Sequence, residues 1–135
     1  MSEIKVNALT GKTTAKTVTV TVGATATQSL EQGLAKAWFY TTDKTTHVLD
    51  NSLNISTITD NDAGRPEANF INNFNNTSIV AAGDGGYNRF IGSYTTDGGI
   101  TTSSFAHILL SSSGSIGDVA STGVGLGIQY NGDLA

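Results

Sequence analysis

The chain has 135 residues, a length that suits one ordinary domain with an extended arm. Charged residues make up 13% of the sequence, roughly half of the usual share, and the formal net charge is −4. Because Lys and Arg form no cluster, this balance argues against nucleic acid as a partner. Cysteine is absent, which excludes a disulfide framework and a thiolate metal site.

The remaining composition favours strands joined by tight turns. Thr, Ser, Asn and Gly take the place of charged residues, with 16 Gly and one Pro. The N-terminal segment has neither the apolar core nor the charge pattern of a signal peptide, and the longest apolar run is far too short for a membrane span. We therefore expect a soluble protein, assembled in a cytoplasm and without membrane insertion.

Residues 1–37 are predicted to form a β-ribbon followed by a helix. In residues 16–22 (KTVTVTV) Val and Thr alternate strictly, which indicates a strand with one apolar face and one hydroxyl face. An isolated hairpin is marginally stable and its edges invite another chain. The ribbon is either an edge hairpin docked on its own domain or an intertwined oligomeric stem, and we favour the stem because ribbon and helix cannot enclose a core unaided.

The helix is expected within residues 24–40. There Leu30, Leu34, Ala37 and Trp38 stand at i, i+4, i+7 and i+8, which is one stripe of a helix. A helix of two to three turns is marginal alone in water and needs a partner surface. The residues predicted to drive oligomerisation are Val18, Val20, Val22, Leu30, Leu34 and Trp38.

Residues 38–135 are predicted to form an antiparallel β-sandwich-like domain. Short alternating runs are separated every ten or so residues by turns rich in Gly, Asp and Asn. The predicted strands span residues 36–42, 50–58, 67–74, 78–82, 88–95, 100–110 and 124–130. Within the second of these, Ile58 breaks the alternation by one residue, which suggests a bulge or the end of the strand.

Three of these strands supply the expected core. Ala68, Phe70 and Phe74 are core candidates. Residues 100–110 carry apolar side chains on both faces, which is typical of a central strand covered on each side. Val124, Leu126, Ile128 and Tyr130 alternate strictly along residues 124–130, and Gly123, Gly125 and Gly127 occupy the opposite face, so we expect a close approach onto that face.

No catalytic residue, metal site or cofactor is predicted. His47 and His107 are the only histidines, and neither sits in a nucleophile or metal motif. We expect His107 to be structural and His47 to be exposed near a turn. Residues 60–64 (DNDAG) open like a calcium loop but lack its later Gly and Glu, so an Asx-rich hairpin turn is favoured.

Aromatic and amide side chains gather in residues 72–76 and 87–94. Such groups can stack on and hydrogen-bond a carbohydrate or a protein receptor, although ordinary turn chemistry is the favoured interpretation. The candidate receptor contacts are Tyr87, Asn88, Arg89 and Tyr94.

Residues 26–39 (ATQSLEQGLAKAWF) and 50–61 (DNSLNISTITDN) resemble a family of short tail-fibre and virion-surface proteins of marine bacteriophages. In that family a GLAKAW segment precedes an aromatic strand, and a D-S-[FL]-N-[VI]-S-S-[VI]-T-D-N strand and a Gly-rich turn follow. Here GLAKAW stands at residues 33–38, and Asn51 is inserted before Ser52. The resemblance covers roughly residues 1–70 and weakens after Gly64, where the family's GTGDYTVNF becomes AGRPEANF.

The resemblance implies a phage structural protein, a homotrimer whose N-terminal part oligomerises or attaches to other virion proteins. We expect a non-enzymatic tail fibre that contacts host-surface carbohydrate or protein and resides in the virion after assembly in the host cytoplasm. The alternative is a capsid decoration or cement protein that stabilises the coat. A third class, a host-envelope depolymerase, would need a catalytic carboxylate pair, which nothing in the sequence marks.

Overall fold

The computed structural model describes residues 8, 18–22, 26–29, 34–41, 47–85, 89–95, 98–118 and 125–135. The chain divides into two compact units, Met1–Leu34 and Ala35–Ala135. Unit 1 and unit 2, as we call them, are described separately below.

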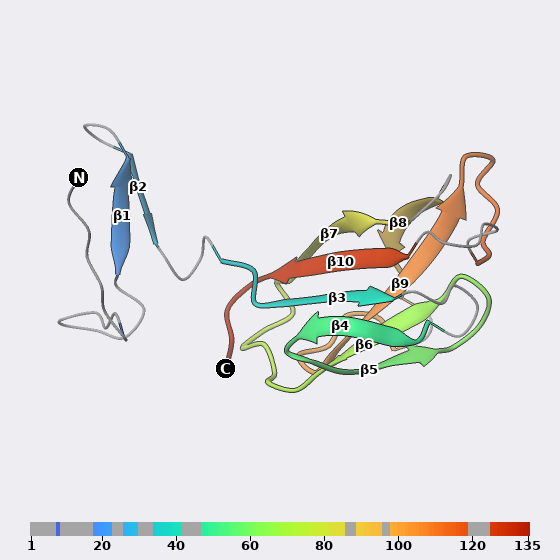
Figure 1. Ribbon diagram of the computed structural model, residues 1–135, viewed down its shortest axis with the longest axis horizontal. Coiled ribbons are helices and arrows are strands. Elements are labelled where there is room, and N and C mark those ends of the chain that lie inside the picture. The colour runs from blue at the N-terminus through green and yellow to red at the C-terminus, as the bar shows by residue number, and fades with distance from the viewer. Residues whose placement is uncertain are drawn as a thin grey trace. The chain divides into compact units, whose positions relative to one another are not determined.

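Unit 1 contains a two-stranded antiparallel ribbon (Figure 1). It pairs β1 (Thr19–Val22) with β2 (Ala26–Ser29), so that Val20 lies opposite Gln28 and Val22 opposite Ala26. Strand β1 covers residues 19–22 of the strand predicted at residues 16–22, and its partner β2 lies in the segment predicted to be helical.

The helix predicted within residues 24–40 is wrong at its described positions. Residues 26–29 belong to β2, residues 34–36 form no helix, and β3 begins at Ala37. Pairing with β1 satisfies the backbone groups of residues 26–29 in a ladder, and this outweighs a weak helical stripe in a Thr-containing segment. Residues 23–25 and 30–33 lie outside the described residues.

Unit 2 consists of two four-stranded antiparallel sheets (Figure 1). The first sheet, in the order β4-β3-β10-β7, contains β3 (Ala37–Thr41), β4 (Leu49–Leu53), β7 (Val80–Asp84) and β10 (Leu126–Asn131). The second sheet, in the order β5-β6-β9-β8, contains β5 (Ile55–Asp60), β6 (Pro66–Phe70), β8 (Arg89–Ser93) and β9 (Ser104–Ser111). The prediction of a mainly β protein with antiparallel sheets is confirmed.

Aromatic rings from both sheets meet in the core. Tyr130 on β10 is fully buried, and its ring centroid lies 6.4 Å from that of Phe39 in its own sheet. The same ring lies 5.2 Å from Phe70 on β6 and 5.6 Å from Phe105 on β9, both in the second sheet. These contacts join the inner faces of the two sheets and give the unit a sandwich-like arrangement.

Alternation in the sequence identified part of this core correctly. Ala68, Phe70 and Phe74 are buried, as predicted, with exposed fractions of 0%, 7% and 1%. Strand β9 is central in its sheet, between β6 and β8, and it buries both Phe105 and Ala106 on opposite faces. The predicted central strand is therefore confirmed.

The predicted strand at residues 50–58 is instead two strands in different sheets. Asn54 separates β4 from β5 in a left-handed conformation with φ of 57°, which Asn tolerates better than most residues. Its Oδ1 accepts the Asn72 N–H at 2.7 Å, and its Nδ2 donates to the Asn72 carbonyl at 3.0 Å. The expected irregularity is present as a register shift between Ile55 and Thr57.

We predict that Gly83→Ala destabilises unit 2 while Gly127→Ala does not. A Cβ at Gly83 would overlap the Gly127 carbonyl oxygen on the neighbouring strand, whereas a Cβ at Gly127 would come no closer than 3.6 Å to any atom. Forcing β7 away from β10 is expected to cost about 1–3 kcal/mol of unfolding free energy, measured by urea denaturation. Equal stabilities for the two variants would contradict this close approach.

Candidate functional site

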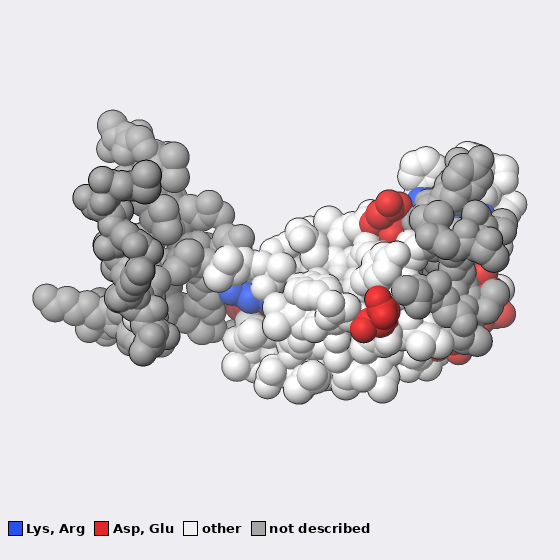
Figure 2. All heavy atoms as spheres, in the orientation of Figure 1, with Lys and Arg blue, Asp and Glu red and all other residues white. Residues whose placement is uncertain are grey.

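The outer face of the β4-β3-β10-β7 sheet carries the most distinctive surface of unit 2. Phe39 and Ile128 point into the core with 2% exposure each, so their neighbours along the strands turn outward. Among those neighbours, Tyr40 is 39% exposed, and Leu53, which pairs with Trp38 from β4, is 49% exposed. Figure 2 shows mostly uncharged side chains on the side where β10, β3 and β4 lie in Figure 1.

The strand register aligns these outward residues in two rows that cross all four strands, because directly opposed residues point to the same face. In the order β4, β3, β10, β7, the first row is Leu53, Trp38, Gln129 and Ala82, and the second row is Asn51, Tyr40, Gly127 and Asp84. Neither row contains Lys or Arg, and Asp84 is the one acidic member. We call these eight residues the outer-face rows.

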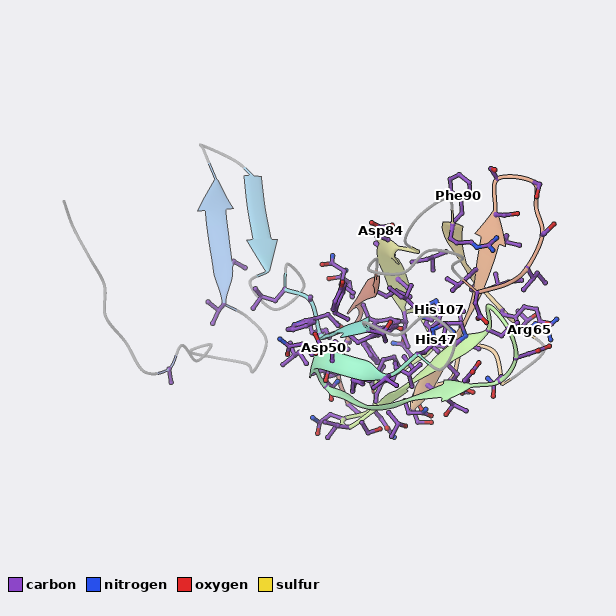
Figure 3. The ribbon with its side chains drawn as sticks, turned by 45° about the vertical axis from the view of Figure 1, so that its right-hand side comes forward. His47, Asp50, Arg65, Asp84, Phe90 and His107 are labelled. Carbon is purple, nitrogen blue, oxygen red and sulfur yellow. The ribbon has the colours of Figure 1, made fainter. Side chains whose placement is uncertain are left out.

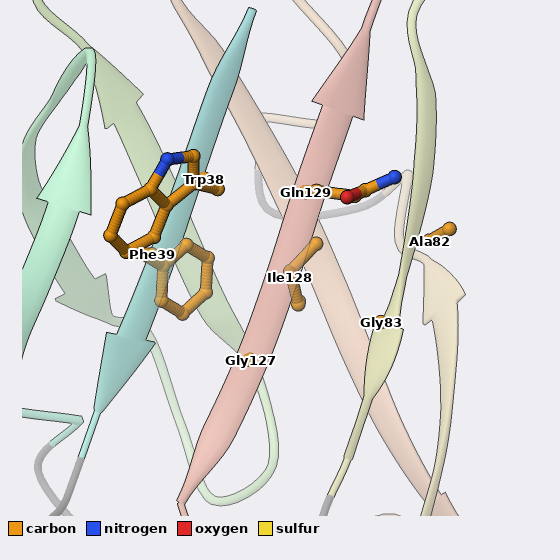
Figure 4. A pocket seen from close by; sticks show the side chains of 7 residues that line it. All are labelled: Trp38, Phe39, Ala82, Gly83, Gly127, Ile128 and Gln129. Atoms are coloured by element: carbon orange, nitrogen blue, oxygen red, sulfur yellow. The ribbon is translucent and has the colours of Figure 1, made fainter. Parts of the chain in front are cut away.

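A shallow, open hollow of about 430 Å³ lies between β3, β10 and β7 (Figure 4). Trp38 borders it on β3, and the Gln129 side chain extends from β10 toward β7. Phe39 and Ile128 also line it, and because their side chains are buried on the inner face, they contribute their backbone as the floor. Gly127 on β10 and Ala82 and Gly83 on β7 are small, so the floor lies close to the backbone of the sheet.

The Tyr40 ring approaches the glycines of the last strand segment. A Cβ at Gly125 would overlap the Tyr40 ring and the Thr41 carbonyl, and a Cβ at Gly127 would lie 3.6 Å from Tyr40 Cδ2. The predicted close approach onto the glycine face is therefore confirmed, and the approaching group is an aromatic ring from the neighbouring strand. This packing holds Tyr40 beside the hollow.

His107 is a core residue and does not face the hollow (Figure 3). Its Nε2 lies 2.6 Å from the Tyr130 hydroxyl, and its ring stacks on Phe105 with centroids 4.6 Å apart. Burial lowers the pKa of His107 to about 3, and the backbone of Gly92 opposes this shift only in part. Burial also raises the pKa of Tyr130, so both groups of this pair are uncharged at neutral pH.

His47 is buried, with 1% exposure, and the expectation that it would be exposed is wrong. Its Nε2 lies 3.6 Å from Asp118 Oδ1, and that oxygen accepts the Gly64 N–H at 2.6 Å. Arg89 Nη2 donates to the Asp118 carbonyl at 2.8 Å. The segment around Asp118 therefore holds β8 and the β5–β6 loop together and covers the histidine.

Two of the four predicted receptor contacts, Arg89 and Tyr94, lie among the described residues. Tyr87 and Asn88 lie outside the described residues. Arg89 is engaged with the Asp118 carbonyl, while the Tyr94 ring lies under the Arg65 guanidinium at 4.7 Å. Both described residues thus contact other segments of unit 2, and neither lines the hollow.

The amides of residues 72–76 make turn contacts. Asn72 is paired with Asn54, and Asn76 Oδ1 accepts the Ser78 N–H at 2.8 Å. In the 60–64 segment, Asp62 Oδ1 accepts the Ala63 N–H at 2.8 Å, and the Asp62 carbonyl accepts the Arg65 N–H at 2.8 Å. The favoured interpretation of residues 60–64 as a hairpin turn is confirmed, and in residues 72–76 the Asn76 contact is local whereas the Asn72 contact reaches Asn54.

The residues predicted to drive oligomerisation fall in both units. Val18 is partly exposed next to β1, Val20 and Val22 belong to β1, and Leu30 lies outside the described residues. Leu34, at the end of unit 1, is 56% exposed. Trp38 belongs to β3 in unit 2.

Within the described ranges, no three His, Cys, Asp or Glu side chains are grouped closely enough to hold a metal ion. The same residues include no helix of the length and apolarity that a membrane crossing requires. No model of a known protein family, no curated protein and no solved structure matches the chain.

The sequence predicted a role in oligomerisation for Trp38 and assigned no site to Tyr40. The outer-face rows combine strands that are far apart in sequence, from residue 38 to residue 129. The one local signal was the alternation of Gly123, Gly125 and Gly127 with apolar residues, which indicated that part of one face lacks side chains.

We predict that His107 makes the protein less stable as the pH falls. The unfolded chain binds a proton at His107 near pH 6.5 whereas the folded chain does so only near pH 3, so stability is lost as pH falls through this window. Between pH 7 and pH 4, His107→Gln should remove about 2–3 kcal/mol of the pH dependence of unfolding, measured by urea denaturation. Tyr130→Phe, which leaves His107 buried, should retain that dependence, and parallel curves for wild type and His107→Gln would contradict the assignment.

Proposed function

We propose that the chain is a bacteriophage virion structural protein, a homotrimeric tail fibre that assembles through unit 1 and presents unit 2 to the host surface. The observation that carries this proposal is where the family-like segments fall in the fold. Residues 33–38 lead into β3, and residues 50–61 form most of β4 and all of β5. They place Trp38 opposite Leu53 on the outer face.

The later departure from the family pattern also fits a displayed unit. It begins after Gly64, in the loop that leads to β6. The β3–β4 pair and the crossing at Asn54 would then be the shared framework, and the strands and loops that follow would vary with the host. Loops on a rigid scaffold are where recognition usually varies.

Unit 1 supports self-association because a two-stranded ribbon is marginally stable alone. Additional copies would pair its open edges and cover its valine-bearing positions. We assign this role to Val18, Val20, Val22, Leu30 and Leu34, which precede unit 2. Three displayed copies would bind a host surface together, and avidity would strengthen weak individual contacts.

A capsid decoration protein is the second candidate, and the exposed apolar side chains of unit 2 favour it. Leu53 is 49% and Val80 is 65% exposed, and both belong to strands at the edges of the same sheet. Such side chains could pack against coat subunits as well as against a host receptor.

Light scattering of the full chain tests the trimer. Wild type should have three times the 13.9 kDa mass of one chain. Val20→Asp/Val22→Asp should lower the mass to that of one chain, because charges at these positions oppose burial between copies.

The matched control is Thr19→Asp/Thr21→Asp, which places the same charges on the same strand at alternate positions and should remain trimeric. A monomeric wild-type protein would contradict the trimer. Gold labelling of particles that carry the protein then separates the two candidates, since label on the tail supports a fibre and label on the head supports decoration.

A further inference from the structure

We infer that the hollow between Trp38 and Gln129 binds a neutral sugar chain, which lies across the outer face of the β4-β3-β10-β7 sheet. This inference rests on the proposed role in host contact and names the chemistry of the contact. The site does not include Arg89 and Tyr94, whose side chains contact Asp118 and Arg65 respectively.

Two aromatic rings give the site its stacking surface. Trp38 and Tyr40 alternate on one strand and face outward about 7 Å apart along it. A sugar ring presents C–H groups on one face and hydroxyls around its rim, so it can stack on an aromatic ring and still hydrogen-bond at its edge. Because the Tyr40 ring packs over Gly125, it is fixed in place before any ligand arrives.

Amide groups stand beside both rings in the register of the sheet. Gln129 is exposed, lies next to Trp38 in its row, and its amide has no hydrogen-bond partner among the described residues. Asn51 lies next to Tyr40, and its Oδ1 accepts the Ser52 N–H at 2.9 Å, which leaves its amide N–H groups as donors. Each ring is thus paired with a side chain suited to sugar hydroxyls.

The floor of the hollow has room for a ligand. Gly127 and Ala82 are small, and the volume of about 430 Å³ falls within the range of small-molecule sites. The open, shallow form suits a chain that enters and leaves on both sides rather than a single enclosed molecule.

Charge and polarity favour a neutral sugar chain over the other occupants. The rows hold no Lys or Arg to pair with an anionic sugar. Packing by a protein surface would bury the amides of Gln129 and Asn51, at about 1–3 kcal/mol for each group left without a partner. Sugar hydroxyls would instead provide those partners.

The single tryptophan of the chain is Trp38, so its fluorescence reports directly on the hollow. The full-length protein is titrated with neutral hexasaccharides of glucose, mannose, galactose and N-acetylglucosamine, and with a hexasaccharide of uronic acid. We expect a saturable shift of the emission and weaker acrylamide quenching with at least one neutral chain, and no saturable response to the uronic acid chain.

Two variants locate the binding. Gly127→Val fills the floor, and Gln129→Ala removes an exposed amide without burying anything; each should weaken binding by at least about fivefold. Thr57→Val is the matched control, because it adds the same valine to an exposed strand position in the other sheet and should leave affinity unchanged.

Lack of a saturable response to every neutral chain would overturn the sugar site, as would full affinity in both variants. Protection of Trp38 that rises with protein concentration alone would overturn it in favour of a second copy on this face. A trimer that gives no sugar response would remove the sugar site alone. A sugar response from a protein that stays monomeric would support the site and count against the trimeric fibre.

Discussion

The hydrogen bond between His107 and Tyr130 is the contact that fixes how the two sheets of unit 2 meet. Apolar packing is not directional, but a buried hydroxyl needs a partner at one place. Tyr130 belongs to β10 and His107 to β9, so their 2.6 Å contact ties one sheet to the other. The low pKa of His107 keeps the pair uncharged, which makes its burial compatible with an aromatic core.

The same contact determines which side chains of β10 face the solvent. Because side chains alternate along a strand, burying Tyr130 and Ile128 places Gln129 and Gly127 outside. A register slip of one residue in β10 would turn Tyr130 and Ile128 outward and Gln129 and Gly127 inward. Both the His107–Tyr130 hydrogen bond and the hollow would then be lost. The proposed sugar site is therefore held in place by the strongest part of the core, as a rigid recognition surface requires.

The strands of unit 2 could be predicted from sequence where alternation is strict and burial is one-sided. Leu126, Ile128 and Tyr130 show this pattern and form the buried side of β10. Leu53 and Ile55 have the period-two spacing of a single strand, and this pattern predicted one strand where the structure has two. Asn54 turns the chain between them into the other sheet, and only its tolerance of a left-handed backbone signalled this.

The helix predicted from the apolar stripe between Leu30 and Trp38 is wrong for a related reason. Four apolar residues at helical spacing are a weak local signal, and pairing with β1 and with the sheet of unit 2 gives residues 26–29 and 37–41 a full ladder of hydrogen bonds. The outer-face rows could not be predicted, because they depend on which strands become neighbours. That pairing is set by the core and not by any local segment.

Unit 1 assembles the protein, in our proposal, while the outer face of unit 2 stays open for recognition. The most direct measurement of this division is acrylamide quenching of Trp38 in the purified wild type and in Val20→Asp/Val22→Asp, each at its measured oligomeric mass. Equal quenching in a trimeric wild type and a monomeric variant is the predicted result. Stronger quenching in the monomer would show that assembly covers Trp38, and it would contradict the separation of the two roles.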